Sequence, residues 1–275
     1  MDRSDVCRLL ASKDPELGGF CLGLDPEDPS RIERVAWLAL WLRDPGESPI
    51  PEGMMENSKD ESEARFDALL KACSFFLDQE APSDDANRDE EICSEICLWA
   101  RDHYDRHGYW GLKPLGWLKK ICHRNVRSYG RLQVEEQPFL EALEGDRVPN
   151  ENERVLALHI PATGPLLPSD VDESLVQIRE SYAEKEIRFL TCHSWLLAPE
   201  LEKVLREDSN ILSFQQRFEI IRDSEDEGQA LERVFGADDK TANNDLPQEN
   251  DLQRSMVKAR EDGKKFGIAL GVIPF

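Results

Sequence analysis

The sequence predicts an α+β fold in which a helical N-terminal half is followed by a mixed β-sheet flanked by helices. Up to about residue 125, apolar residues recur at helical spacing between loops rich in Pro, Gly and acidic residues. From about residue 126, strand-like segments alternate with helical segments. Two of the strand-like segments look alike, since each is apolar, ends near a histidine and precedes a proline with an acidic residue. We therefore expect two domains, residues 1–125 and residues 126–275.

The helices of the first half are predicted from their apolar stripes. Ser30 is the expected N-cap of a helix whose stripe extends over residues 32–42. A second helix presents apolar residues over 66–77, and a third is expected from about residue 91 to residue 107, with Gly108 as its stop signal. These stripes predict a packed helical core.

In the second half, two similar runs predict neighbouring parallel strands. Residues 155–160 and 187–195 are largely apolar, as in strands that are covered on both faces. Two such strands joined by one helix form a right-handed parallel crossover. His159 and His193 are then expected near the same carboxyl edge of the sheet, where open α/β sheets usually bind ligands. This edge is the strongest functional lead in the sequence.

Prolines with acidic residues predict the helices that follow these two strands. Pro168, Ser169 and Asp170 supply an N-terminal proline, a capping oxygen and a first-turn carboxylate. Pro199 and Glu200 repeat the pattern after the second strand. Each strand is therefore expected to lead directly into an amphipathic helix.

The remaining segments complete the predicted second half. Residues 129–134 predict a strand ahead of the two similar runs. A further strand is expected from Gln215, and helices are expected near residues 229–235 and 251–262. Residues 266–273 predict a closing strand.

The charge of the chain is its outlying property. Its 275 residues include 56 acidic and 34 basic residues, which gives a formal net charge of -22. Such a surface repels phosphate backbones and anionic membranes, so neither nucleic acid nor a membrane is an expected partner. The sequence shows no secretory signal and no apolar stretch near the roughly 18 residues of a membrane span. With seven cysteines that fit reduced thiols, these features predict an acidic cytoplasmic protein.

Four potential zinc ligands lie on one expected helix: Cys93, Cys97, His103 and His107. Their spacing argues against zinc, because structural sites usually place two cysteines on a tight knuckle and the other ligands on a separate element. We interpret the cysteines as helix core and the histidines as a solvated helix end, so no metal is predicted. The sequence also lacks the glycine-rich nucleotide loops, the zincin motif and the nucleophile elbow of α/β-hydrolases.

Residues 113–131 reverse the sign of the charge. The basic residues of this segment, with no acidic residue among them, are Lys113, Lys119, Lys120, Arg124, Arg127 and Arg131. One interpretation is that the segment binds an anion, such as the phosphates of a nucleotide-containing cofactor. The other is that it forms ion pairs with the acidic excess of the same chain. The sequence alone leaves both open.

Several motifs resemble those of a bacterial family of acyltransferases, in which an N-acyltransferase N-terminal domain precedes a C-terminal domain like that of the GNAT N-acetyltransferases. In chain order they are GLKPLGW (111–117), YGRLQV (129–134), LHIP (158–161), GPL (164–166), CHSWLL (192–197), SNI (209–211), FQQRF (214–218) and VFG (234–236). The resemblance extends over the whole chain. It implies that residues 1–125 form the N-acyltransferase domain and residues 126–275 the GNAT-like domain.

The resemblance implies a sheet in which two adjacent parallel strands part, so that acyl-CoA lies between them like an extra strand. The two histidine-ended strands are the natural candidates for this pair. GNAT enzymes typically hold the pyrophosphate with a glycine-rich loop after the first of these strands, whereas this chain has PATGPLLP at 161–168. The candidate cofactor-binding residues are Thr163, Gly164, Ser169, Arg124, Arg127 and Arg131.

The resemblance also implies transfer of an acyl group from acyl-CoA to an amine by direct attack on the thioester. His159 is the candidate base, because imidazole titrates near neutrality. His193 or Ser194 would orient the base or protonate the leaving thiolate, and the acceptor would be a small-molecule or peptide amine. The alternative is a non-catalytic GNAT-like binding or regulatory module that has lost acyl-CoA use. The prolines and first-turn carboxylates of residues 161–173 motivate that alternative.

Overall fold

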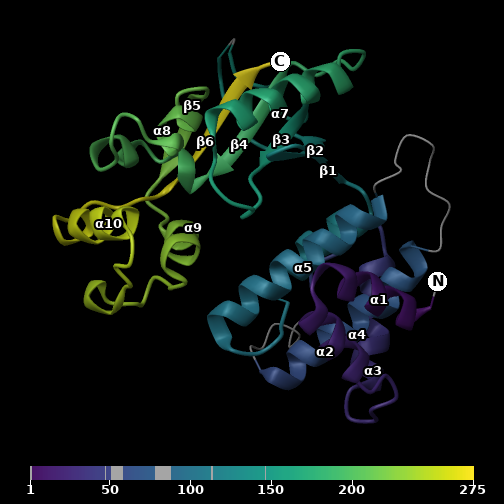
Figure 1. The fold of residues 1–275 in the computed structure, drawn as a ribbon. Coiled ribbons are helices and arrows are strands. Elements are labelled where there is room, and N and C mark those ends of the chain that lie inside the picture. The colour runs from purple at the N-terminus through teal and green to yellow at the C-terminus, as the bar shows by residue number, and fades with distance from the viewer. Residues whose placement is uncertain (1, 47, 51–57, 78–87, 113, 146) are drawn as a thin grey trace. The chain divides into compact units, whose positions relative to one another are not determined.

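The computed structural model describes the chain except for residues 1, 47, 51–57, 78–87, 113 and 146. It divides into two compact units, Met1–Val126 and Arg127–Phe275, each with its own apolar core. The predicted order, a helical half followed by a mixed sheet flanked by helices, is confirmed (Figure 1).

Helices α1 to α6 belong to the first unit. Their bounds are Arg3–Lys13 (α1), Pro15–Gly23 (α2), Ile32–Arg43 (α3), Lys59–Phe76 (α4), Arg88–His107 (α5) and Leu115–Cys122 (α6). The predicted apolar helices over 66–77 and 91–107 are confirmed by α4 and α5. The prediction that Ser30 caps α3 is wrong, because the Ser30 hydroxyl donates to Asp28 Oδ1 at 2.7 Å and Arg31 becomes the N-cap residue. A local Asp turn thus competes with the cap.

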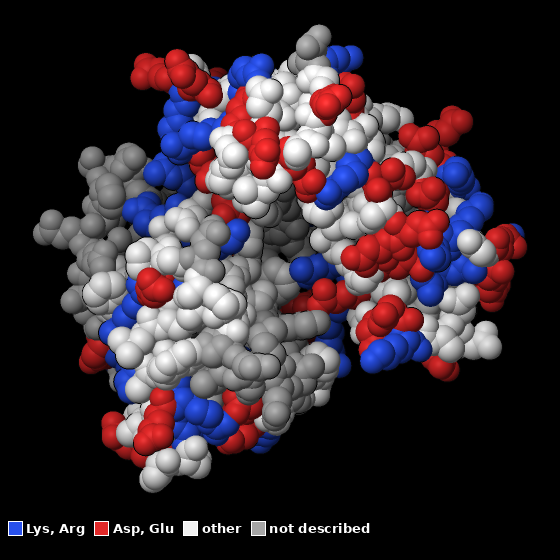
Figure 2. Space-filling view, turned by 180° about the vertical axis from the view of Figure 1, so that it is seen from behind, with Lys and Arg blue, Asp and Glu red and all other residues white. Residues whose placement is uncertain are grey.

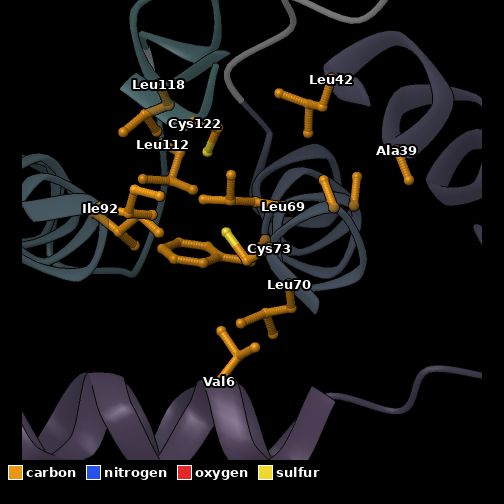
Figure 3. Packing of buried hydrophobic residues seen from close by; sticks show 14 of the residues in the cluster. Val6, Ala39, Leu42, Leu69, Leu70, Cys73, Ile92, Leu112, Leu118 and Cys122 are labelled. Carbon is orange, nitrogen blue, oxygen red and sulfur yellow. The ribbon is translucent and has the colours of Figure 1, made fainter. Parts of the chain in front are cut away.

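The core of the first unit gathers side chains from several helices. Figure 3 shows Val6, Leu42, Leu69, Ile92 and Leu112 pointing toward one another from different segments. Each is at most 1% exposed. Burial of a Val, Leu or Ile side chain contributes roughly 1.5–3 kcal/mol, so this unit has a substantial core of its own.

The second unit is built on a six-stranded sheet in the order β1-β2-β3-β4-β6-β5. The strands are Val126–Tyr129 (β1), Leu132–Pro138 (β2), Arg154–His159 (β3), Phe189–Ser194 (β4), Glu219–Ser224 (β5) and Ile268–Pro274 (β6). Strands β3 and β4 are parallel, whereas the pairs β2/β3, β4/β6 and β5/β6 are antiparallel. Helix α7 (Pro168–Ser181) joins β3 to β4, so the predicted parallel crossover is confirmed.

The sheet separates two apolar layers. On one face, Leu156 and Leu190 pack in the same cluster as Val171 of α7, and α7 and α8 (Asn210–Gln215) lie over this face (Figure 1). On the other face, Val155 and Phe189 pack in a smaller cluster. Because successive strand residues alternate between faces, the odd-numbered residues of β2, β3 and β4 share this second face.

Two predicted elements of the second unit form differently. Residues 129–134 are not one strand, because Gly130 adopts φ 56° and turns the chain between β1 and β2. After β4, the predicted helix is replaced by two short 3₁₀ helices, Trp195–Leu197 and Pro199–Lys203. The Ser194 hydroxyl accepts a hydrogen bond from the Leu196 N–H at 3.2 Å, and Pro199 has no N–H with which an α-helix could continue.

The strand predicted from Gln215 begins later, at Glu219. Residues Asn210–Gln215 instead form α8, whose N-cap Ser209 accepts a hydrogen bond from the Ile211 N–H at 3.2 Å. Gln215 is buried and donates to the Ala198 carbonyl at 2.9 Å, which holds it in the helix. The later predicted elements are confirmed by α9 (Gly228–Ala230) with the π-helical turn Leu231–Phe235, by α10 (Asp251–Glu261) and by β6.

The surface carries the acidic excess seen in the sequence. Figure 2 shows Asp and Glu side chains in broad patches on the displayed face, with Lys and Arg side chains among them. None of the helices in the described part of the chain combines the length and the apolar character that crossing a membrane requires.

Candidate active site

The parallel strands β3 and β4 pair over a short distance and then part. Their ladder joins Leu156 to Leu190 and Ala157 to Thr191. Beyond these pairs, β3 continues beside β2, with Gln133 opposite His159, and β4 continues beside β6. The inner backbone edges of β3 and β4 past Thr191 therefore do not pair with each other. Such edges have the donors and acceptors that bind an extended, amide-containing ligand as an added strand.

His159 lies at the parting of the strands and contacts a buried carboxylate. Its Nε2 is 3.3 Å from Oε2 of Glu135, and the two side chains are 32% and 6% exposed. Glu135 and His159 lie on the same face, because Glu135 pairs with Ala157, two residues before His159. A carboxylate in this position can fix the orientation of an imidazole ring. The pair is therefore a candidate for a general base with its orienting group.

His193 lies on the same face of the neighbouring strand β4, so the predicted shared edge brings both histidines to the parting strands. Desolvation, followed by the positive charge of Arg222, lowers the pKa of His193 below its ordinary value. Arg222 itself donates to Glu141 Oε2 at 2.5 Å. The His193 imidazole therefore has a cation, Arg222, and the carboxylates of Glu141 and Asp226 nearby, and desolvation favours its neutral form.

Ser194 and Cys192 lie on the opposite face of β4, as alternation requires. The Ser194 hydroxyl is used by the backbone of the following 3₁₀ helix, as described above. Burial raises the pKa of Cys192 to about 12, so this thiol stays protonated near neutrality. The structure therefore brings His159 and His193 together on one face and leaves Ser194 out of that arrangement.

The loop after β3 and the start of α7 hold three of the predicted cofactor-binding residues. Thr163 and Gly164 are exposed, and Gly164 adopts φ 114°, a conformation that L side chains rarely adopt. The predicted capping role of Ser169 is wrong, since its hydroxyl donates to Asp170 Oδ1 at 2.9 Å and the N-cap residue is Leu167. No side-chain oxygen caps this end of α7. Pro168 has no N–H, and the Asp170 and Val171 N–H groups both donate to the Leu167 carbonyl at 3.1 Å, so the Ser169 N–H is the amide of this turn that is left for water or a ligand.

The three predicted arginines lie in different surroundings. Arg131 contacts the loop after β3, where its guanidinium donates to three backbone carbonyls. Burial lowers the pKa of Arg131, and the nearby Asp170 carboxylate opposes that shift. Arg127 is an exposed residue of β1. Arg124 belongs to the helical unit, where it follows α6 with φ 63°. The structure thus places Arg131, but not Arg124, in the same unit as the loop.

A fourth arginine neutralises part of the acidic start of α7. Arg217 donates to Asp172 Oδ1 from Nη2 at 2.7 Å and from Nε at 3.0 Å. The same guanidinium reaches the Pro168 carbonyl at 3.4 Å. These two hydrogen bonds to one carboxylate oxygen offset part of the first-turn acidity that would repel an anion at this helix end.

Glu135 and Arg217 were not among the predicted site residues. The alternation of Gln133, Glu135 and Gln137 along one strand face is a signal that was present in the sequence. Buried polar residues on a strand face otherwise lined by apolar neighbours indicate a functional face. No comparable signal marks Arg217, because its role depends on α8 packing near α7.

The thiol and imidazole side chains of α5 differ in burial. His107 is exposed, as the prediction of a solvated helix end requires, but that prediction is wrong for His103, which is buried. Cys93 is buried in the helical core, and Cys97 Sγ donates to the Leu10 carbonyl at 3.9 Å. His103 Nδ1 lies 3.1 Å from the Tyr109 carbonyl. Within the residues that the structure describes, no group of three or more His, Cys, Asp or Glu side chains is placed to hold a metal ion.

Comparison with known proteins agrees with this geometry. The sequence profile of the family described as the GNAT-like C-terminal domain matches residues 126–273. No curated protein matches the chain.

Solved structures extend the likeness to almost the whole chain. An acyltransferase in complex with decanoyl-CoA and teicoplanin superposes with a TM-score of 0.73 at 22% identity, covering 98% of this chain and 86% of that one. A mutant acyltransferase in complex with octanoyl-CoA gives 0.75 at 22% identity, covering 98% and 87%. An acyltransferase in complex with decanoyl-CoA gives 0.68 at 22% identity, covering 99% of both chains. At this identity the likeness establishes the fold of both units.

Proposed function

The chain belongs to the GNAT-like C-terminal domain family, and on that premise we propose that it is an acyltransferase that uses acyl-CoA as its acyl donor. The observation that carries the proposal is the parting of β3 and β4 just where each strand presents a histidine on the same face. The solved neighbours crystallised with CoA esters support the same donor.

The parting strands fit the shape of the donor. The pantetheine arm of acyl-CoA is extended and contains two amide groups, which can pair with the inner edges of β3 and β4. The phosphates would then face the loop after β3 and the start of α7, where the Ser169 N–H and the helix dipole favour an anion. This arrangement places the thioester close to the histidines.

The residues on this face support acyl transfer to an amine by direct attack. The amine nitrogen forms a bond to the thioester carbon, the carbon–sulfur bond breaks, and the amine loses a proton. We assign that proton to His159, with Glu135 stabilising the imidazolium. Backbone N–H groups of β4 next to the parting would stabilise charge on the thioester oxygen. The leaving thiolate takes up a proton from solvent, and the neutral His193 is the candidate that orients the base, since Ser194 lies on the other face.

The acceptor is a small-molecule or peptide amine, and one solved neighbour was crystallised with teicoplanin. Residues 1–125 are proposed to be the N-acyltransferase N-terminal domain, and the protein is proposed to be cytoplasmic. The non-catalytic alternative is not favoured, because contacts from Arg217 offset the first-turn acidity that motivated it.

Calorimetry with CoA and with acyl-CoAs of increasing chain length tests the donor. Micromolar binding of CoA esters is expected, and so is release of free CoA thiol when an amine acceptor is supplied. The His159→Ala variant is expected to bind the donor but to release thiol far more slowly. Absence of binding by every CoA ester would rule out the proposed donor and restore the non-catalytic module as the better account.

A further inference from the structure

The hairpin turn between β1 and β2 is fixed on helix α7. The N–H of Arg131 donates to the Ser174 hydroxyl at 2.8 Å, and this hydroxyl donates to the Asp170 carbonyl at 2.6 Å. Ser174 has no exposed surface. Gly130 permits the close approach, since a Cβ at this position would lie 2.9 Å from Ser174 Oγ. The turn therefore places the Arg131 side chain next to the loop that precedes α7.

The Arg131 guanidinium uses each of its three nitrogens on a different carbonyl of that loop. Nη1 donates to Pro161 at 2.7 Å, Nη2 to Gly164 at 2.9 Å and Nε to Pro165 at 3.2 Å. A planar guanidinium holds its donors in a fixed fork, so three carbonyls bound to it are held in a defined arrangement. Arg131 thus imposes a conformation on the loop.

The same contacts set the direction of the loop amides. In a trans peptide, the carbonyl and the N–H of the next residue point in opposite directions, and the described chain contains no cis peptide. Since the Pro161 and Pro165 carbonyls point to Arg131, the N–H groups of Ala162 and Leu166 point away from it. Neither amide donates a hydrogen bond within the part of the chain that the structure describes.

We infer that Arg131 is a positioning residue that holds the loop after β3 so that the N–H of the exposed Ala162 faces the pyrophosphate of acyl-CoA. This inference rests on the proposed function. In a glycine-rich loop, the backbone itself takes up the shape that presents its amides. Here a side chain from the neighbouring hairpin gives that shape to a loop containing prolines. Arg131 acts through the loop, because its three nitrogens are engaged by carbonyls rather than directed to a phosphate.

Lysine and alanine variants separate this role from a direct ion pair. Arg131→Lys keeps the positive charge but loses the fork, whereas Arg131→Ala loses both. Calorimetry on the full chain would compare CoA with pantetheine, which lacks the pyrophosphate. Both variants are expected to bind CoA roughly ten- to a hundredfold more weakly while keeping the affinity for pantetheine. Arg206→Ala is the matched control, since Arg206 is exposed and paired with Asp208, and it should bind CoA like the wild type.

Two outcomes would overturn the positioning role. One is wild-type CoA affinity in Arg131→Ala. The other is loss in Arg131→Ala with full retention in Arg131→Lys, which would mark a direct contact between the charge and a phosphate.

A measurement without ligand separates this inference from the proposed function. The backbone ¹⁵N–¹H NOE of Thr163 and Gly164 is expected to fall in both Arg131 variants and to stay at the wild-type value in Arg206→Ala. Suppose that the wild type binds no CoA ester but the NOE values of Thr163 and Gly164 still fall in the Arg131 variants. That result would refute acyl-CoA as the donor and leave the positioning role intact. Unchanged NOE values in both Arg131 variants would refute the positioning role even if the wild type binds CoA.

Discussion

The contact between His159 and Glu135 makes a direct prediction about turnover. Removing a general base usually costs about 100- to 10,000-fold, so His159→Ala is expected to lower kcat by that order. Glu135→Gln keeps the size of the side chain but removes the charge that stabilises the imidazolium, and a loss of roughly ten- to a hundredfold in kcat is expected. Single-turnover rates with saturating acyl-CoA are the measurement.

Glu136→Gln is the control for Glu135→Gln. Glu136 is the next residue of β2, points to the other face and contacts Lys185 Nζ at 2.6 Å. The Glu136→Gln variant should keep the wild-type kcat. Equal losses in Glu135→Gln and Glu136→Gln would mean that the acidic strand, rather than the contact with His159, supports turnover.

The second residue-scale prediction concerns His193. Desolvation and Arg222 hold its pKa below 6.5, while Glu141 and Asp226 act in the opposite direction. Arg222→Ala removes a positive charge and frees Glu141, so the pKa of His193 is expected to rise, as measured by NMR titration of the imidazole Hε1 signal. Arg188→Ala, which removes an arginine paired with Glu153 instead, should leave the titration unchanged.

The lowered pKa of His193 also fixes the sign of a pH effect on stability. A histidine whose pKa is lower in the folded state than in the unfolded state binds more protons when unfolded. The contribution of His193 to the free energy of unfolding is therefore fully present above about pH 6.5, the ordinary pKa of histidine. It is lost as the pH falls toward the lower pKa of the folded state. A His193→Gln variant should lose less stability than the wild type between pH 7 and pH 5, as measured by urea unfolding.

At the scale of elements, the turn between β1 and β2 is expected to be intolerant of a side chain. Gly130→Ala places a Cβ both at φ 56° and against Ser174 Oγ. The left-handed conformation alone costs about 1–2 kcal/mol, and displacing the buried Ser174 hydroxyl adds about 1–3 kcal/mol. The free energy of unfolding should fall by the sum of these costs.

Gly263→Ala is the matched control for this prediction. Gly263 has φ 80°, but a Cβ there meets nothing within 4 Å. Only the conformational cost is expected, so this variant should lose less stability than Gly130→Ala. Equal losses would show that Ser174 moves freely and does not fix the turn on α7.

Elements with long periodic patterns were predictable from the sequence, and elements set by tertiary contacts were not. The apolar rhythm of α4 and α5 and the apolar runs of β3 and β4 predicted these elements and the parallel pairing of the two strands. The 3₁₀ helices after β4 were mistaken for an α-helix, because the pattern of Pro199 and Glu200 is also typical of a helix start. The preference of Ser194 for capping a short turn is local and has no periodic signal.

The candidate site was predictable in part for the same reason. Both histidines follow apolar runs, so their shared edge could be read from the strands. The contact of Glu135 with His159 needs the register between β2 and β3, which the sequence does not reveal. The three carbonyl contacts of Arg131 need the fold of a loop that follows a different strand. The roles of Glu135 and Arg131 therefore became visible only in the structure.

At the scale of the whole molecule, the net charge of -22 opposes the charge of the proposed donor. CoA is a polyanion, so the long-range field of the protein slows its approach, whereas a cationic amine is attracted. Added salt screens this field, and the Debye length falls to about 10 Å at 0.1 M. The association rate constant of CoA is therefore expected to rise with salt, while kcat/KM for a cationic amine acceptor falls.

The effect of salt on the association rate constant is measured by stopped-flow binding of a fluorescent CoA ester at low salt and at about 0.3 M salt. Pantetheine, which has no charge, is the control. A pantetheine association rate that does not change with salt would show that screening acts through charge alone. If CoA instead associates more slowly as salt is added, the local arginines near the loop after β3 outweigh the field of the whole chain. That result would assign the recognition of CoA to short-range basic groups, since salt slows association only where it screens a net attraction.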